Sequence, residues 1–297
     1  MSAQRFDTVL GLQQRRSPLA VIIKIAVYTL MVLVFAGPLI GLLIGAFSHV
    51  VDPTKFSLVP EGGFTFANFG RAGERRIWNY LFNSFVVVGF GLALQMLVSV
   101  FAAYSLARKR MRGASILMLL ILATMMLPEE VIAVPLSVVL ADVPPFGIVD
   151  PGMRVNLTNS YLGMILPVGA WGFSILVMTE FMKEVPIELE EAAKIDGAGD
   201  LRTFFFVILP LCRPALGVIG VFGFTMIWDQ YLLPLIVAVD YTHWTLPLAL
   251  RSLRGDEEVG IGVLLAGTIL AVLPSILVFL AFQRQFVRGL TSGAIKG

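Results

Sequence analysis

Six long stretches of apolar residues, separated by polar loops, divide this chain of 297 residues. A helix of about 20 apolar residues crosses a hydrocarbon core of about 30 Å, and each stretch reaches that length. The stretches are continuous, whereas the strands of a membrane β-barrel alternate between apolar and polar residues. We therefore expect an all-α polytopic membrane protein with six transmembrane helices. The predicted spans are Ile25–Phe47, Tyr80–Leu106, Ala114–Leu140, Tyr161–Met182, Pro214–Val239 and Ile261–Phe282.

Composition supports the same class. Hydrophobic residues make up 57% of the chain and charged residues 14%, whereas a soluble globular protein has about 45–50% and about 25%. Too few polar residues remain to cover six buried helices, so a soluble protein is excluded. No internal repeat or low-complexity segment divides the chain, and one transmembrane domain is expected.

The distribution of Lys and Arg predicts the orientation, because cytoplasmic loops carry the excess of these residues. With the N-terminus inside, 15 of the 22 basic residues fall in inside segments and 7 in outside segments. The strongest cluster is Arg108, Lys109, Arg110 and Arg112, directly after the second span. Both termini are therefore predicted in the cytoplasm, with 1–24 as a cytoplasmic N-terminal segment.

Residues for metal, redox or nucleotide chemistry are sparse. Cys212 is the single cysteine, so no internal disulfide forms. His49 and His243 have no ligand-type residues at metal-binding spacing, and no glycine-rich phosphate loop is present. No cofactor is expected in this chain, and binding and splitting ATP by the usual loop is excluded.

The loop 184–212 contains a short helix of unusual composition. Pro186 suits the first turn of a helix, and the glutamates that follow it favour the positive end of the helix dipole. Ala192 and Ala193 are strong helix formers with small side chains, and Gly197 ends the helix. Such a helix offers a small surface to another protein, or it is a solvated connector. The physical pattern leaves both readings open.

The motif is more specific. Glu191-Ala192-Ala193, Gly197 and Leu209-Pro210 fit the pattern Glu-Ala-Ala-x3-Gly-x9-Ile-x-Leu-Pro, with Val207 at the Ile position. This resembles the EAA loop of permease subunits of ABC importers. Further segments resemble the smaller permease of the carbohydrate branch, of maltose and glycerol-phosphate type, over residues 25–297. These are Phe82-Asn83-Ser84, Ala103–Arg108, Pro128, Pro135-Leu136, Ser160–Pro167 and Gly289–Gly297.

The resemblance implies a helical permease domain, 25–297, with the loop 184–212 as its coupling segment and 284–297 as a cytoplasmic tail. The implied partners are a second permease, a cytoplasmic ATPase dimer that binds ATP and Mg, an extracytoplasmic binding protein and membrane lipid. No nucleic-acid partner is implied. It places the chain in a bacterial inner membrane. The implied contacts with the ATPase come from the coupling helix and the tail: Glu191, Ala192, Ala193, Asp196 and Gly197, and Ser292, Gly293, Lys296 and Gly297.

Charged residues within spans point to a solute path or to bonds between helices, because an isolated charge at mid-span costs roughly 2.5–3.5 kcal/mol. Asp229 lies beside Trp228 in the fifth span, an aromatic and carboxylate pair that suits a sugar. Glu129 and Glu130 follow Pro128 in the third span. Each of these residues lines the path or serves as a structural helix contact, and the sequence leaves both roles open.

The predicted function is a non-enzymatic membrane subunit of an ATP-driven importer for a sugar or sugar-like solute. Within this class, the alternative is a permease for another polar solute such as glycerol phosphate. A secondary transporter or channel that works without ATP is the alternative from another class, and the EAA helix argues against it. A membrane enzyme would need a catalytic cluster at one face, which the sequence lacks.

Overall fold

The computed structural model describes residues 18–49, 59–109, 111–143, 155–254 and 259–294, with 283–294 as backbone. Across these residues the fold is built from helices, with two isolated β-bridges, Ser48 to Phe64 and Val143 to Val155. The predicted all-α class is confirmed. Between the third and fourth predicted spans, the Pro- and Gly-rich segment 141–160 is typical of an irregular loop, and its residues 144–154 lie outside the described residues.

Three of the predicted spans are single helices. They are α2 (Pro18–Ala46), α4 (Ile77–Arg108) and α15 (Ile261–Ala294). α2 begins before the predicted Ile25, so part of the expected N-terminal segment 1–24 is helical. α4 and α15 also extend beyond their predicted bounds.

The other three spans are interrupted. α5 (Ala114–Thr124) and α6 (Glu129–Ala141) meet at 104°, and α7 (Tyr161–Val168) and α8 (Gly172–Glu184) at 40°. The predicted fifth span comprises α12 (Arg213–Trp228) and α13 (Leu232–Val237), separated by residues 229–231.

Proline accounts for two of these interruptions. A proline has no N–H for the carbonyl four residues before it, and its ring clashes with that carbonyl. For Pro128 that residue is Thr124, where α5 ends. For Pro234 it is Gln230, between α12 and α13.

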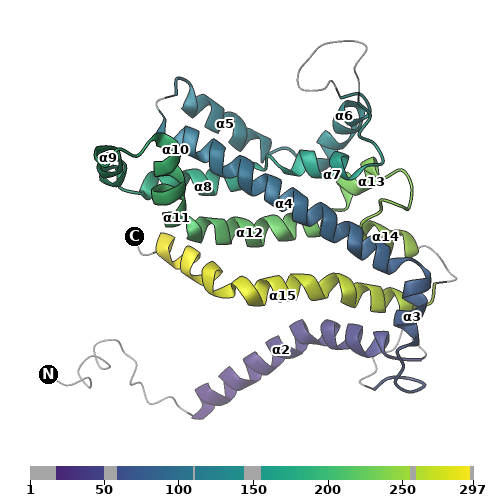
Figure 1. The fold of residues 1–297 in the computed structure, drawn as a ribbon. Coiled ribbons are helices and arrows are strands. Elements are labelled where there is room, and N and C mark those ends of the chain that lie inside the picture. The colour runs from purple at the N-terminus through teal and green to yellow at the C-terminus, as the bar shows by residue number, and fades with distance from the viewer. Residues whose placement is uncertain (1–17, 50–58, 110, 144–154, 255–258, 295–297) are drawn as a thin grey trace.

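Short elements complete the fold. α3 (Ala67–Glu74) and α14 (Leu246–Leu253) lie near the start of α4, while α9 (Ile187–Ile195) projects from the opposite end of the bundle (Figure 1). Between α9 and α12 the chain forms α10 (Asp200–Thr203), the π-helix η2 (Phe204–Ile208) and α11 (Leu209–Leu211). The segment from α10 to α11 meets α12 at 71°.

α4 is the central helix. It packs against α7, α8, α12 and α14, while α15 packs on α12 and α2 packs on α15 (Figure 1). Two apolar clusters follow α4. One surrounds Ile77, Val87 and Trp228. The other surrounds Tyr104 and Phe204, near α9. Between them, the buried Gln95 donates a 2.7 Å hydrogen bond from Nε2 to Ser174 Oγ, which joins α4 to α8.

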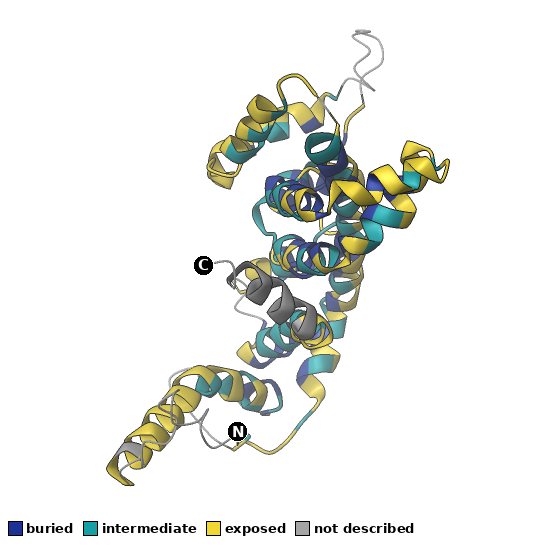
Figure 2. Cartoon of the chain, turned by 90° about the vertical axis from the view of Figure 1, so that its left-hand side faces the viewer, coloured by how far each residue is buried: buried dark blue, intermediate teal, exposed yellow. Residues whose placement is uncertain are grey.

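Exposed residues occupy much of the outer faces of the helices (Figure 2), and many of them are large and apolar. α5 contains no buried residue, and the apolar part of α2, Val21–Ala46, has none in its most hydrophobic window. Such surfaces are stable in contact with lipid tails or with another membrane subunit, and would be unstable in water. The exposed helices therefore fit a multi-pass membrane protein.

Candidate functional site

The coupling segment predicted at 184–212 forms a helix, α9, that stands outside the main bundle (Figure 1). Pro186 is its N-cap, with Glu188 and Glu190 in the first turn. Much of its surface is free within this chain, and the apolar side chain of Ile195 is 87% exposed. An exposed apolar residue on a helix end outside the bundle indicates a surface that another protein covers.

The C-terminus of α9 has the geometry of a Schellman motif. Ala198 N–H donates to Ala193 O at 2.9 Å, and Gly197 N–H donates to Lys194 O at 3.0 Å. Gly197 has φ of +79°, in the left-handed region that glycine adopts without steric cost. The spacing of Ala-Ala and Gly in the motif is therefore the spacing that this helix ending requires.

Arg108, at the end of α4, holds the inner face of α9. Its guanidinium donates hydrogen bonds to the carbonyl oxygens of Met182 and Val185, at the end of α8. Its Nε lies 3.1 Å from Oε1 of Glu190 in an ion pair, and the two side chains are only 6% and 9% exposed. One side chain thus joins α4, α8 and α9.

Lys109 makes a second link from the end of α4. Its Nζ lies 2.5 Å from Oδ2 of Asp200, at the start of α10. The ammonium also lies 5.2 Å from the centre of the Tyr104 ring. Both flanks of α9 are therefore joined to the same helix end, so this basic cluster has a structural role beside the orientation that it indicates.

Most of the predicted coupling residues are exposed on this anchored helix and at its C-terminal end. Glu191, Ala192, Asp196 and Gly197 are exposed and Ala193 is half-buried. In the tail, Ser292 and Gly293 belong to the backbone of α15, whereas Lys296 and Gly297 lie outside the described residues. The end of α15 lies at the same end of the bundle as α9 (Figure 1).

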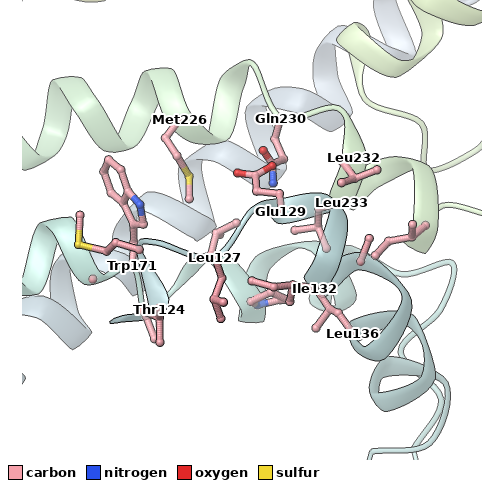
Figure 3. Close-up of a pocket in the computed structure, with 17 residues that line it drawn as sticks. Thr124, Leu127, Glu129, Ile132, Leu136, Trp171, Met226, Gln230, Leu232 and Leu233 are labelled. Atoms are coloured by element: carbon pink, nitrogen blue, oxygen red, sulfur yellow. The ribbon is translucent and has the colours of Figure 1, made fainter. Parts of the chain in front are cut away.

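A second candidate site is a cavity of about 360 Å³ beside the three interrupted spans (Figure 3). Its lining includes residues from each interruption: Thr124, Met125, Leu127 and Glu129; Ala170, Trp171 and Gly172; and Gln230 and Leu232. Helix ends leave backbone N–H and C=O groups without intrahelical partners. In membranes, interrupted helices are tolerated where they line a cavity, and solute sites of transporters lie at such places.

The predicted path residues separate in the structure. Glu129 lines the cavity and extends into it in Figure 3, whereas Glu130 and Asp229 are exposed and do not line it. Trp228 is 2% exposed and donates from Nε1 to Ala271 O at 2.9 Å. Its ring stacks on Phe224 at 5.4 Å and contacts Phe85, so the face expected to stack on a sugar is covered within this chain.

Gln230, Trp171 and Thr124 also line the cavity and were not among the predicted site residues. An amide, an indole and a hydroxyl are groups that bind sugars through hydrogen bonds and stacking. The proline four residues after Gln230 was a usable sign of the interruption there.

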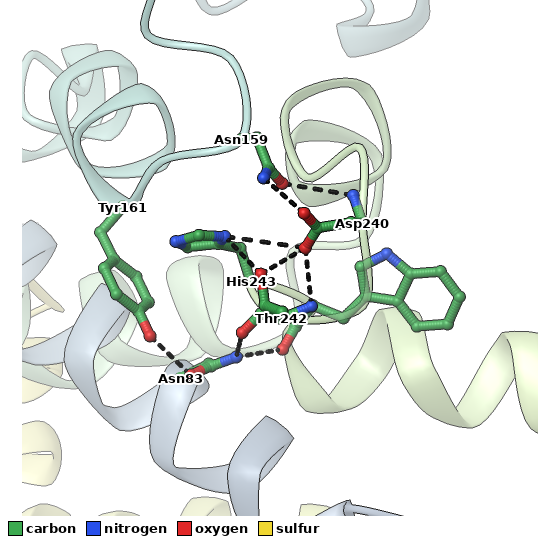
Figure 4. Close-up of polar contacts among 7 residues, drawn as sticks. Asn83, Asn159, Tyr161, Asp240, Thr242 and His243 are labelled. Carbon is green, nitrogen blue, oxygen red and sulfur yellow. Dashed lines mark hydrogen bonds and ion pairs between the residues drawn. The ribbon is translucent and has the colours of Figure 1, made fainter.

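A polar network lies at the other end of α4 (Figure 4). Nδ2 of the buried Asn83 donates to the carbonyl oxygens of Thr242 and Trp244 at 2.8 and 2.9 Å, and its Oδ1 accepts from the Tyr161 hydroxyl at 2.7 Å. Ser84 Oγ accepts from the N–H of Leu246 at 2.8 Å. The pair Asn83 and Ser84 therefore holds the loop before α14.

That loop is itself fixed by Asp240. Asn159 donates from Nδ2 to Asp240 Oδ2 at 2.7 Å, and the N–H of Thr242 donates to Oδ1 at 2.8 Å (Figure 4). Hydrogen bonds from the hydroxyl and the N–H of Thr242, and from Asn159, lower the pKa of the Asp240 carboxyl.

Comparison with known proteins shows what this arrangement resembles. Residues 95–292 match the family described as binding-protein-dependent transport system inner membrane component. The arabinooligosaccharides transport system permease protein AraQ of Halalkalibacterium halodurans is 30% identical over 282 residues, 94% of each chain. The melibiose/raffinose/stachyose import permease protein MelC of Bacillus subtilis is 32% identical over 235 residues, 78% of this chain and 82% of that one.

The fold is also similar to a chain in the crystal structure of a bacterial ABC transporter involved in the import of the acidic polysaccharide alginate. The TM-score is 0.73 at 21% identity, with 96% of this chain and 98% of that chain covered.

Proposed function

The chain belongs to the family of binding-protein-dependent transport system inner membrane components, and we propose that it forms, with a second permease, the path by which an ATP-driven importer moves a sugar across the bacterial inner membrane. The observation that carries this proposal is α9. Its inner side is ion-paired to Arg108 of α4, which also bonds the end of α8, while most of its motif residues are exposed on the other side. Such a helix can receive force from another protein and pass it to the bundle.

ATP binding and hydrolysis belong, in this proposal, to a separate ATPase dimer that supplies ATP and Mg. The exposed residues Glu191, Ala192, Asp196 and Gly197 and the half-buried Ala193 contact it, and the tail from Ser292 to Gly297 lies at its edge. α9 and the end of α15 face the cytoplasm. This orientation follows the excess of Lys and Arg at that end of the bundle.

Cysteine labelling tests the orientation in a Cys212→Ser background. A cysteine at the exposed position 194 of α9 is expected to resist an impermeant reagent on intact cells, whereas one at the exposed position 67 of α3 is expected to react. The opposite pattern would reverse the topology.

The solute is a sugar or sugar-like molecule, as for the relatives named for arabinooligosaccharides and for melibiose, raffinose and stachyose. Glu129 is the one ionisable residue among the described residues that line the cavity, and the lining has no Lys or Arg. A carboxylate without a neighbouring cation disfavours phosphate, so an uncharged sugar is favoured over glycerol phosphate. Asp229 and Glu130, which are exposed and lie outside the cavity lining, are assigned in this proposal to contacts with the second permease.

Partners at the other end include an extracytoplasmic binding protein. A similar fold occurs in the alginate ABC transporter in complex with an alginate pentasaccharide-bound periplasmic protein, with a TM-score of 0.60. The loop before α14, fixed by Asn83 and Ser84, offers a rigid outer surface for such a partner.

Co-purification with a tagged chain tests the function. The wild type is expected to retain a second permease and an ATPase, whereas Ala192→Trp is expected to lose the ATPase and keep the permease, because it adds bulk to the exposed face of α9. Ile116→Trp, at a 65% exposed site on α5, is the control for added bulk away from α9 and is expected to retain the ATPase. Sugar uptake by this chain in vesicles without an ATPase would instead identify a secondary transporter or channel.

A further inference from the structure

α4 differs from the helices that surround the cavity because it is uninterrupted. Its 32 residues, Ile77–Arg108, span about 48 Å at 1.5 Å per residue. Asn83 and Ser84 lie near one end and Arg108 forms the other. One helix therefore contacts both the outer polar network and the coupling helix.

The contacts at the inner end of α4 carry a large free-energy cost, because they bury charged groups. Arg108 and Glu190 are almost fully buried, and removing two charges from water costs several kcal/mol before their attraction is counted. Nη2 of the guanidinium also donates to Met182 O and Val185 O, while Nε faces Glu190; a lysine, with one nitrogen, cannot occupy both positions. A simple apolar contact would join these helices without that cost, so the arrangement fits a need for one defined geometry.

The bonds at the outer end are also specific. Asn83 is 3% exposed, and its amide bonds two carbonyl oxygens of the loop, Thr242 O and Trp244 O, as well as the Tyr161 hydroxyl. Ser84 accepts the first N–H of α14. A shift of α4 along or about its axis would break these bonds unless the loop moved with it.

We propose that Arg108 is a positioning residue that fixes α9 to α4. When the ATPase displaces the coupling helix, α4 then moves as a rigid body and repositions the loop 240–246 at the opposite end. This inference rests on the proposed function, since it requires an ATPase that moves α9. In the reverse direction, a binding protein on the outer loop would act on α9 through the same helix, because coupling between two sites is reciprocal.

The test uses the assembled importer in lipid nanodiscs, with Arg108→Lys and Glu190→Gln. Arg108→Lys keeps the charge but cannot reach both the carbonyls of α8 and the Glu190 carboxylate, and Glu190→Gln keeps the shape but loses the ion pair. Neither alters the exposed face of α9. We expect the ATPase to stay bound and basal hydrolysis to persist, while stimulation by the loaded binding protein falls about tenfold per assembled complex, within the usual range for coupling.

Lys183→Met is the matched control. Lys183 forms an exposed ion pair of 2.8 Å with Glu180 at the same end of the bundle, and the two side chains are 49% and 57% exposed. Its loss is expected to leave stimulation unchanged. Together, these variants separate a buried link between α9 and α4 from a general effect of charge in this region.

Two outcomes would overturn the proposal. Normal stimulation per complex in both variants would show that the ion pair has no part in coupling. A loss of assembled complex with normal stimulation in the remainder would show that the pair serves only folding. Absence of a bound ATPase from the wild type would contradict the proposed function itself, and is thereby distinguished from failure of this inference.

Discussion

Replacement of Gly197 by alanine is expected to weaken attachment of the ATPase through the backbone alone. Gly197 has φ of +79°, and a non-glycine residue in the left-handed region costs roughly 1–2 kcal/mol. A Cβ at position 197 would have no atom within 4 Å, so no steric clash within the chain adds to this cost. An energy of about 1–2 kcal/mol changes the ratio of the closed to the frayed helix end by roughly 5–30-fold.

Three variants separate the contributions. Gly197→Asn is expected to remain close to the wild type, because asparagine tolerates the left-handed region. Gly197→Ala is expected to lose ATPase affinity by up to about 30-fold, the limit reached when the frayed helix end becomes the major state. Gly197→Leu is expected to lose more than alanine, because its side chain also enters the exposed surface of α9. Gly70→Ala is the control, since a Cβ there also has no atom within 4 Å and α3 lies far from α9.

The assay titrates purified ATPase against the permease pair in nanodiscs and measures bound ATPase and stimulated hydrolysis. Equal affinity for the asparagine and alanine variants, both at the wild-type level, would refute the reasoning that the helix end requires a left-handed residue. A large loss of ATPase affinity in the leucine variant alone would show that glycine is needed there because the ATPase surface leaves no room for a side chain.

Three further outcomes are expected. Glu129→Gln is expected to relax discrimination against an anionic sugar by up to about 100-fold, because two like charges about 6 Å apart repel by ~3 kcal/mol at an effective dielectric constant of about 20. Competition between a uronic acid and a neutral sugar for uptake measures this discrimination. An unchanged preference would show that Glu129 does not line the path. Trp228→Phe is expected to cost about 1 kcal/mol of stability through loss of the hydrogen bond to Ala271 O, and Trp228→Ala is expected to cost about 3–5 kcal/mol. Unfolding in detergent measures both losses. A change in solute preference without a loss of stability would contradict a role of Trp228 in the core. The lowered pKa of Asp240 adds stability that is fully present above the ordinary carboxyl pKa of about 3.9 and is lost as the pH falls through the lowered value. In the Asp240→Asn variant, the unfolding temperature should therefore depend less on pH below about pH 4. An unchanged pH dependence would show that this network does not cause the loss of stability in acid.

Much of the fold could be predicted because membrane spans depend on local composition. The six apolar runs correspond to α2, α4 and α15 and to three interrupted spans. The interruptions themselves were not located. Pro128 and Pro234 were visible, but a proline in a membrane either kinks or ends a helix according to what neighbouring helices and water offer its freed backbone groups.

The candidate site was predictable only where it depends on local geometry. The Ala-Ala and Gly spacing predicted the end of α9 because a Schellman motif is formed within one short segment. The partners of Arg108 come from segments more than 70 residues away, so its burial depends on tertiary packing. Trp228 and Asp229 are neighbours in sequence, yet successive residues on a helix face different directions, and Trp228 turns toward α15.

The meeting of three helix interruptions at the cavity has a consequence for how such a protein changes during evolution. Backbone groups freed at the ends of α5, α7 and α12 persist whatever side chains surround them, so the polar character of the site survives most substitutions. Side chains such as Glu129 and Trp171 can then change one at a time without loss of the scaffold. Descendants of one ancestral permease can therefore acquire new sugars by small mutational steps, while the framework that holds each sugar is inherited intact.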